Sequence, residues 1–419
     1  MSLPAQHLPD HPTISNQALI PHIIPALAAL FIIVTAVICF NRYASRLEDR
    51  YVHALAPLQL PQAMNGSVLQ QAALRQPDLL AVYGSSEMLS EPSPYQAPQL
   101  FASYPNGFAV FNISAAGENP LDIAQELAAL GPVLKNKKVV ISFTPSMFDR
   151  TAVEIDQYAG NFSRMHAYAL AFSPYLSMSL KQRVAKRMVD YPETLRHDMV
   201  LALAVRNLAR GGLASRLKYA LIYPLGQLEA LIIRMQDHYA VWYFIQTHPE
   251  INPFPTRAAQ PIDWTAKLTE AETEQQAATC NNSYGFENNA WIETYHQHVE
   301  THPAGSADQQ YRARMENSKE WGDLELVLDI FREVGAKPMI LSRPIQGRLY
   351  AAAGVSPQAQ QGYYAKLGQL VGNRRFPLAD FKEYTADTLF SIDGSSHTSR
   401  KGWVIVDRTL DAFYHDTYR

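Results

Sequence analysis

The feature that most constrains this chain is an uninterrupted apolar segment at residues 21–40, near the start of its 419 residues. The segment contains no Lys, Arg, Asp or Glu. A helix of this length matches the hydrocarbon core of a bilayer, which is about 30 Å thick. We therefore expect one transmembrane anchor, preceded by a tail at residues 1–20.

A cleaved secretory signal is the alternative interpretation of this segment. Such signals begin with a basic region and end at a cleavage site made of small residues. Residues 1–20 contain no Lys or Arg, and the apolar run ends in Ile38, Cys39 and Phe40. These features favour an uncleaved anchor.

The charges that follow the segment bear on its orientation. Arg42, Arg46 and Arg50 lie just after it, and Glu48 and Asp49 offset them only in part. By the positive-inside rule these cations favour a cytoplasmic C-terminus, although the rule is weaker when a long folded domain follows.

The composition narrows the classes of protein to consider. Hydrophobic residues make up 47% of the chain, which is enough for one large domain with insertions or for two domains. The net charge of −3 argues against nucleic acid as the main partner, because phosphate binding requires a basic surplus. The two cysteines, Cys39 and Cys280, are far apart in unlike surroundings, so we expect no structural disulfide.

Short apolar runs alternate with helical patterns on both sides of a long middle section. The predicted strands are 79–83, 108–113, 139–143 and 338–341, and the predicted helices are 121–134, 322–334 and 402–415. Strands that alternate with helices predict a parallel sheet covered on both faces, which is a three-layer α/β fold.

The middle section has a different pattern. Residues 151–260 are amphipathic and helical, with interruptions at Gly211, Gly212 and Pro224, and basic residues outnumber acidic ones there. Two interpretations stay open: a helical cap with a solvated basic face, or a surface that lies on anionic headgroups or docks a membrane partner. Residues 251–315 are polar and predict an irregular excursion.

These patterns divide the chain into six segments. They are a tail at 1–20, the anchor at 21–40, a polar and partly helical connector at 41–75, a first part of the α/β domain at 76–150, an insertion at 151–315, and the second part of the α/β domain at 316–419.

Candidate catalytic residues follow the first predicted strand. It runs into Gly84, Ser85 and Ser86, where a turn would deliver a hydroxyl group to the start of a helix. Open α/β sheets bind ligands at the carboxyl ends of their strands. Backbone N–H groups at a helix start can also stabilise a developing oxyanion.

Other candidate site residues are predicted to reach the same edge of the sheet. Gly117 follows the second strand, Ser146 follows the third, and Asp393 and His397 lie near the C-terminus. A Ser, an acid and a His that converge in this way indicate nucleophilic acyl-transfer chemistry. The 13 histidines form no HExxH pattern and no phosphate loop is present, so we expect neither a metal nor a cofactor.

The ensemble of motifs resembles the SGNH hydrolases and, more narrowly, the DltD family. Gly84-x-Ser86 matches the SGNH nucleophile box, and Asn112 with Gly117 matches the spacing of the second box. The DltD-like features besides the anchor are Gly-Ser-Ser-Glu at 84–87, Ser318-Lys319-Glu320 with Asp323, Asn281-Asn282 with Gly285, Pro344 with Gly347, Tyr363-Tyr364, and His397 followed by Lys401-Gly402-Trp403. The similarity spans nearly the whole chain.

The resemblance implies a fold and a set of residue roles. The fold would be a parallel sheet of the SGNH-hydrolase, flavodoxin-like type with a large helical insertion, preceded by one transmembrane helix. The implied roles are Ser86 as nucleophile with Ser85 as the less favoured alternative, His397 as general base, Asp393 as its orienting acid, and an oxyanion hole from the backbone N–H groups of Ser86 and Gly117 with Ser146 as a further donor.

Two positions depart from the family pattern. Asp393 precedes His397 by four positions, whereas the usual Asp-x-x-His motif has three. Ser146 stands where the family tends to carry Asn or Gln, and a hydroxyl is a shorter donor.

The resemblance also implies a function outside the cytoplasm, against the local charge count. DltD proteins help to esterify envelope polymers such as teichoic acid with D-alanine, together with a membrane-bound O-acyltransferase and an acyl-loaded carrier protein. Two alternatives stay open: a non-catalytic polymer-binding or scaffold partner of that acyltransferase, and a simple esterase or thioesterase.

Overall fold

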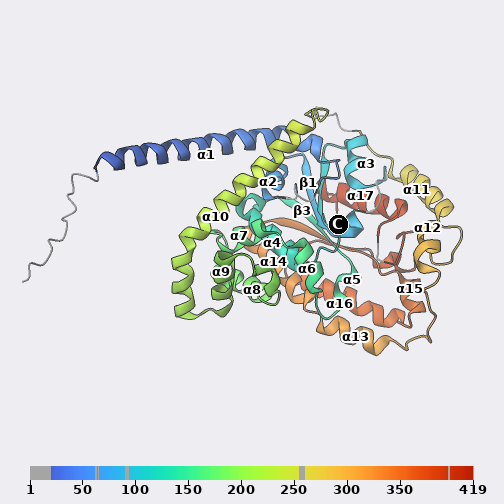
Figure 1. Ribbon diagram of the computed structural model, residues 1–419. Coiled ribbons are helices and arrows are strands. Elements are labelled where there is room, and N and C mark those ends of the chain that lie inside the picture. Colours follow the sequence, from blue (N-terminus) through green and yellow to red (C-terminus); the bar gives the residue numbers. More distant parts are fainter. Residues whose placement is uncertain are drawn as a thin grey trace, which may run out of the picture.

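A computed structural model describes residues 20–61, 64, 66–89, 94–253, 260–394 and 397–418. Nearly all of the predicted tail at 1–20 lies outside these residues. Figure 1 shows a long helix, α1, projecting from a body built around a central sheet.

The sheet has five parallel strands in the order β2-β1-β3-β4-β5. Their bounds are Leu79–Gly84 for β1, Ala109–Ser114 for β2, Lys138–Phe143 for β3, Lys337–Ser342 for β4 and Leu378–Asp380 for β5. Every residue of β1 is buried, as expected for a strand with both faces covered. The predicted parallel α/β fold is confirmed, with the four predicted strands and a short fifth one that the sequence did not suggest.

Alternate strand residues enter two separate cores. Ala81 and Tyr83 pack on one side, while Leu80 and Val82 pack on the other. The first core contains α2 (Ser67–Arg75), α4 (Pro120–Leu130), α14 (Glu320–Val334) and α16 (Pro357–Gly372). The second contains α3 (Ala97–Ser103), α11 (Trp264–Ala278) and α17 (Arg400–Tyr414). The period of two along each strand therefore produces the three layers.

The predicted anchor is the first part of a single helix, α1 (Ile20–Leu55). Its outer part is exposed, and it is long and apolar enough to be a candidate membrane anchor. Its last part packs on the body through Val52 and Leu55, both fully buried. The segment expected as a connector is therefore the end of α1 together with α2. A buried hydrogen bond of 2.5 Å, between Glu48 and His238, joins α1 to α10.

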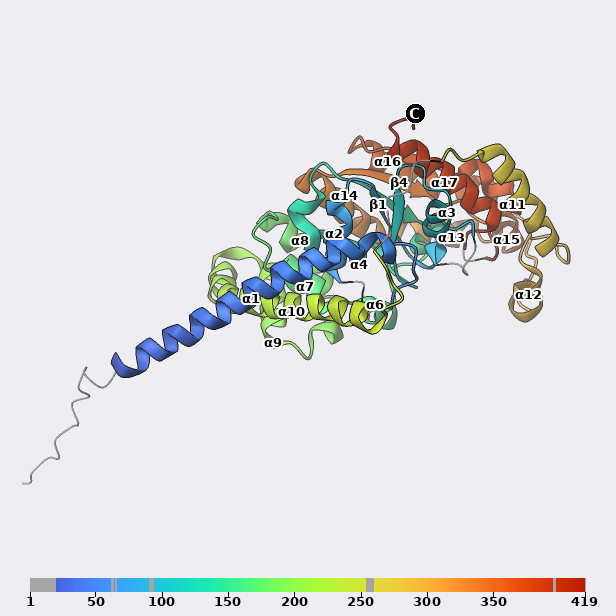
Figure 2. The ribbon, with the colours of Figure 1, turned by 90° about the horizontal axis from the view of Figure 1, so that it is seen from above.

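The helical insertion packs beside α4 and α14. It comprises α6 (Ile155–Asn161), α7 (Arg164–Ala171), α8 (Met178–Met188), α9 (Met199–Arg210) and α10 (Gly212–Thr247). Figures 1 and 2 both place these helices on the side of the body from which α1 projects.

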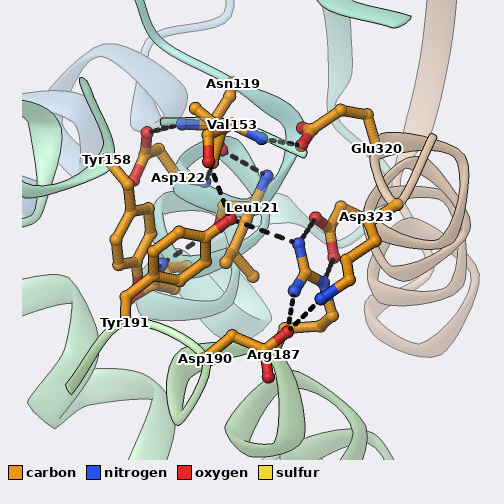
Figure 3. Close-up of polar contacts among 12 residues, drawn as sticks. Asn119, Leu121, Asp122, Val153, Tyr158, Arg187, Asp190, Tyr191, Glu320 and Asp323 are labelled. Carbon is orange, nitrogen blue, oxygen red and sulfur yellow. Dashed lines mark hydrogen bonds and ion pairs between the residues drawn. The ribbon is translucent and has the colours of Figure 1, made fainter. Parts of the chain in front are cut away.

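Polar contacts between α8, α14 and the segment before α6 hold the insertion in place (Figure 3). Arg187 on α8 forms a bidentate salt bridge with the fully buried carboxylate of Asp323, and each of its two hydrogen bonds is 2.8 Å long. Glu320 accepts a hydrogen bond of 2.9 Å from the backbone N–H of Val153. The DltD-like motif at 318–323 therefore lies where the insertion meets the α/β domain.

The prediction of an irregular excursion at 251–315 is wrong for much of that stretch. It contains α11 and α13 (Asp308–Asn317), with short helical turns between them. The pattern was hard to see because α11 fully buries only Ala271 and Gln275, while Trp264 and Leu268 are half-buried against the second core and most of its other residues are polar. Its register on α17 depends on polar contacts such as Lys401 with Glu272, at 3.0 Å.

Candidate active site

The turn after β1 is tightly packed around Gly84. A Cβ atom at this position would lie 2.6 Å from Met88 Cγ and 2.8 Å from a carboxylate oxygen of Glu87, so a larger residue would displace the turn. The buried Glu87 side chain accepts from the backbone N–H of Ser85 at 3.1 Å. Ser86 then begins a short 3₁₀ helix, η3 (Ser86–Met88), at the carboxyl edge of the sheet.

His397 lies between the Ser86 hydroxyl and the Asp393 carboxylate. Its Nε2 is 2.9 Å from Ser86 Oγ, and its Nδ1 is 2.6 Å from Asp393 Oδ2. Because a carboxylate only accepts hydrogen bonds, Nδ1 carries the proton and Nε2 is left to accept from Ser86. The structure thus brings the three predicted residues together in one chain of hydrogen bonds.

The longer Asp–His spacing is accommodated by the backbone. Asp393 Oδ1 also accepts from the main-chain N–H of His397, at 3.3 Å. One carboxylate therefore holds both the ring and the backbone of the histidine. The hydrogen bond to Asp393 outweighs the effect of burial and raises the pKa of His397.

The segment that carries His397 is attached to the turn that carries Ser86 by Thr398. Its hydroxyl donates to the main-chain carbonyl of Glu87, at 3.1 Å. Thr398 also forms a β-bridge with Ser391. The sequence offered no sign of this contact, because a Thr beside a histidine has no distinctive pattern.

Ser85, the alternative nucleophile, faces away from the histidine. It is 5% exposed, and its hydroxyl donates to the carbonyl of Ala115 at 3.3 Å. This bond joins the ends of β1 and β2. The geometry therefore favours Ser86 over Ser85.

Gly117 and Ser146 lie after β2 and β3, at the same edge as Ser86. Gly117 has φ +76°, a conformation that favours glycine, and its carbonyl accepts from Gln157 at 2.8 Å. The exposed Ser146 hydroxyl lies 2.9 Å from Thr144 Oγ1. Among the described residues, no hydrogen bond joins either of them to Ser86 or His397, so their role as oxyanion donors stays a prediction.

An open pocket of about 400 Å³ lies beside this edge, lined by residues that include Leu89, Ala116 and Gln157. A second cavity of about 260 Å³ lies behind Ala115 and contains buried carboxyl groups. Burial raises the pKa of Glu126 in this cavity to about 7, and it raises the pKa of Glu118 as well.

A buried arginine lies beneath the turn that carries Ser86, and sequence reasoning did not single it out. Arg343 follows β4 and donates to Ser142 Oγ at 3.0 Å and to Met88 Sδ at 2.8 Å. Burial lowers its pKa to about 10, and the nearby carboxylates of Glu87 and Asp407 oppose this shift. Its one signal in the sequence is a cation directly after an apolar strand.

A parallel α/β sheet with a Ser–His–Asp hydrogen-bond chain at its carboxyl edge is the arrangement seen in serine hydrolases. Residues 57–415 match the family described as DltD protein, and the chain belongs to this family. The resemblance inferred from the motifs is thereby confirmed.

Three relatives agree with this membership. The chain is 25% identical to Protein DltD of Bacillus subtilis (strain 168) over 88% of this chain and 90% of the relative. It is 23% identical to Protein DltD of Staphylococcus aureus over 83% and 84% of the two chains. It is 22% identical to Protein DltD of Lacticaseibacillus rhamnosus over 94% and 90%.

Proposed function

We propose that this protein is a membrane-anchored serine O-acyl-transfer protein of the D-alanylation system, in which Ser86 carries the acyl group. The observation that supports this most directly is the hydrogen-bond chain from Ser86 Oγ through His397 to Asp393. Such a chain activates a hydroxyl that is otherwise a weak nucleophile at neutral pH.

The first half of the reaction forms an acyl-serine. His397 Nε2 takes the proton of Ser86 as Oγ attacks the carbonyl carbon of an acyl donor. The tetrahedral intermediate collapses, the bond to the leaving group breaks, and His397 returns the proton to that group. Asp393 holds the ring and stabilises the imidazolium.

The second half repeats these steps with an acceptor. A hydroxyl group of the envelope polymer gives its proton to His397 and attacks the acyl-serine, and Ser86 leaves with the proton restored. Water in place of the polymer would make the protein an esterase. The pocket beside Leu89 and Ala116 offers space for the reacting groups.

The oxyanion would be held by the backbone N–H groups of Ser86 and Gly117. Each such donor stabilises a transition state by about 3 kcal/mol. The Ser146 hydroxyl already shares a hydrogen bond with Thr144 Oγ1, in which either group can be the donor, and a hydroxyl is shorter than the amide side chain usual at this position, which makes it the weaker candidate.

The proposal places α1 across the membrane and the body on the outer side, next to a membrane-bound O-acyltransferase and within reach of its acyl-carrier system. Family membership supports this placement, whereas Arg42, Arg46 and Arg50 favour the opposite orientation. Protease digestion of intact cells measures the orientation directly.

The function is tested by the base-labile ester content of the envelope in cells that carry the native chain, Ser86→Ala, Ser85→Ala or no copy. We expect Ser86→Ala to match the deletion while it still reaches the membrane, and Ser85→Ala to remain active. The amino acid released by base identifies the acyl group. Native ester levels with Ser86→Ala would instead indicate a scaffold.

A further inference from the structure

Helix α10 carries a row of exposed leucines along one face. Leu213, Leu217 and Leu221 are 77%, 60% and 83% exposed, and the row continues through Leu225 and Leu228. Spacings of three and four residues place all five side chains on one side of the helix. A soluble surface rarely exposes an apolar stripe of this length.

The opposite face of α10 is fixed against the body. Tyr219 is 5% exposed and its hydroxyl donates to the carbonyl of Ala171 at 2.6 Å. Gly226 packs so closely on the ring of Phe172 that a Cβ atom would lie 2.1 Å from it. The helix therefore cannot rotate to bury its leucines.

The row lies on the side of the body from which α1 projects. Pro224 lies inside α10, and the first part of this helix runs across the direction of α1, at the edge of the body nearest to the free end of α1 (Figures 1 and 2). The later part of α10 packs on α1 and forms the buried Glu48–His238 pair. A membrane crossed by the outer part of α1 would therefore lie along the leucine row.

Unpaired cations accompany the leucines. Arg206, Arg210, Arg216 and Lys218 are all exposed, and none of them pairs with a carboxylate in the described part of the chain. Glu229 is the sole acidic residue of the sequence from 199 to 236. Helices that lie in an anionic membrane surface typically combine leucines on one face with flanking cations.

We propose that the end of α9 and the first part of α10 together form an interfacial helical segment. This segment lies in the headgroup layer of the membrane that α1 crosses. The leucines would enter the acyl boundary, and the cations would contact lipid phosphates. This inference rests on the anchor role of α1 in the proposed function. Two attachments, α1 and the leucine row, would stop the body from turning about α1 and would hold the Ser86 edge at a constant height above the bilayer.

The test uses the full chain in nanodiscs, with Cys39→Ser and Cys280→Ser as background. A nitroxide is attached at Leu217→Cys, at Val34→Cys in α1, or at Ile292→Cys. Ile292 is 58% exposed and follows α12 (Asn288–Ala290) at the opposite end of the body, so it is a matched apolar control. The measurement compares collisions of each label with oxygen and with a water-soluble nickel chelate.

We expect the label at 217 to be protected from the nickel chelate by about tenfold relative to the label at 292, as for a side chain in the acyl boundary. Equal exposure at 217 and 292, with the label at 34 immersed, would overturn the interfacial helical segment and leave the anchor intact. A water-exposed label at 34 would overturn both.

A second comparison tests the choice of lipid over protein. Arg216→Gln combined with Lys218→Gln should reduce protection at 217 in nanodiscs that contain phosphatidylglycerol and have little effect in phosphatidylcholine alone. Both side chains are exposed, so thermal unfolding should be unchanged. Protection that appears only in native membranes, and not in pure lipid, would assign the row to a protein partner and contradict the proposal.

Discussion

His397 Nε2 lies 2.9 Å from Ser86 Oγ although 311 positions separate the two residues in the chain. The contact depends on the turn after β1 and on the loop before α17, which Thr398 joins to the carbonyl of Glu87. Under the proposed mechanism, the reactivity of Ser86 therefore depends on the folding of the chain, which brings His397 to it.

The reactivity of Ser86 should depend on pH through His397. The hydrogen bond that His397 donates to Asp393 raises the pKa of His397, so the neutral, proton-accepting form becomes the main one at a pH above the ordinary value of about 6.5. We expect labelling of Ser86 by a fluorophosphonate probe to rise with pH, with a midpoint above that value. Asp393→Asn should lower the midpoint and slow labelling by roughly ten-thousandfold.

Asp416→Asn provides the control, because this side chain is largely exposed and pairs with Lys138 at 2.8 Å, far from the Ser86 turn in the sequence. Its labelling should match the native chain. An unchanged midpoint in Asp393→Asn would mean that Asp393 does not act through His397.

Gly84→Ala should disturb the turn after β1 that carries Ser86. The added Cβ would meet Met88 and Glu87, and overpacking of this kind costs about 1–3 kcal/mol. We expect a lower unfolding temperature and slower labelling of Ser86. Gly362→Ala on α16 is the matched control, since nothing lies within 4 Å of its added Cβ and alanine favours helix by up to about 1 kcal/mol.

Loss of Arg187 should destabilise the attachment of the insertion. Arg187→Ala would leave the Asp323 carboxylate, whose side chain is 0% exposed, buried and unpaired. Breaking such a pair costs about 3–5 kcal/mol, which denaturant titration measures. Arg196→Ala removes an exposed pair with Glu193 and should cost less than about 1 kcal/mol. Similar losses in both variants would refute the role of the buried pair.

Stability should fall as pH rises through neutrality because of buried carboxyl groups. Burial raises the pKa of Glu320 to about 7, from an ordinary value of 4.5. The folded chain therefore binds an extra proton between these values, so this contribution is present below pH 4.5 and is lost as pH rises through 7. It is on the order of 3 kcal/mol.

Glu320→Gln keeps the acceptor for Val153 and removes the titration. The difference in unfolding free energy between Glu320→Gln and the native chain should thus change between pH 5 and 8. Glu293→Gln, at an exposed position, should show no such change. His166, whose pKa burial lowers to about 4, acts in the opposite direction below pH 6.5 in every variant, so it cancels in the comparison.

Local signals explain which elements could be predicted. The strands were found because β1, β3 and β4 are apolar runs that end in turns, and the helices at 322–334 and 402–415 have a clear period. β5 was missed because it has only three residues. Helix α11 was missed because its apolar contacts with the second core are few, at Trp264, Leu268 and Ala271, and polar contacts to α17 supply the rest of its attachment.

The sequence by itself determined the candidate anchor, the alternation that produces the parallel sheet, and the set of residues near its carboxyl edge, because each of these depends on neighbours within a few positions. Only the tertiary structure decided that Ser86 and not Ser85 meets His397, that the longer Asp–His segment still closes, and that a leucine row lies on the side of the body from which α1 projects. These outcomes depend on contacts between residues far apart in the chain, and local pattern carries no record of such contacts.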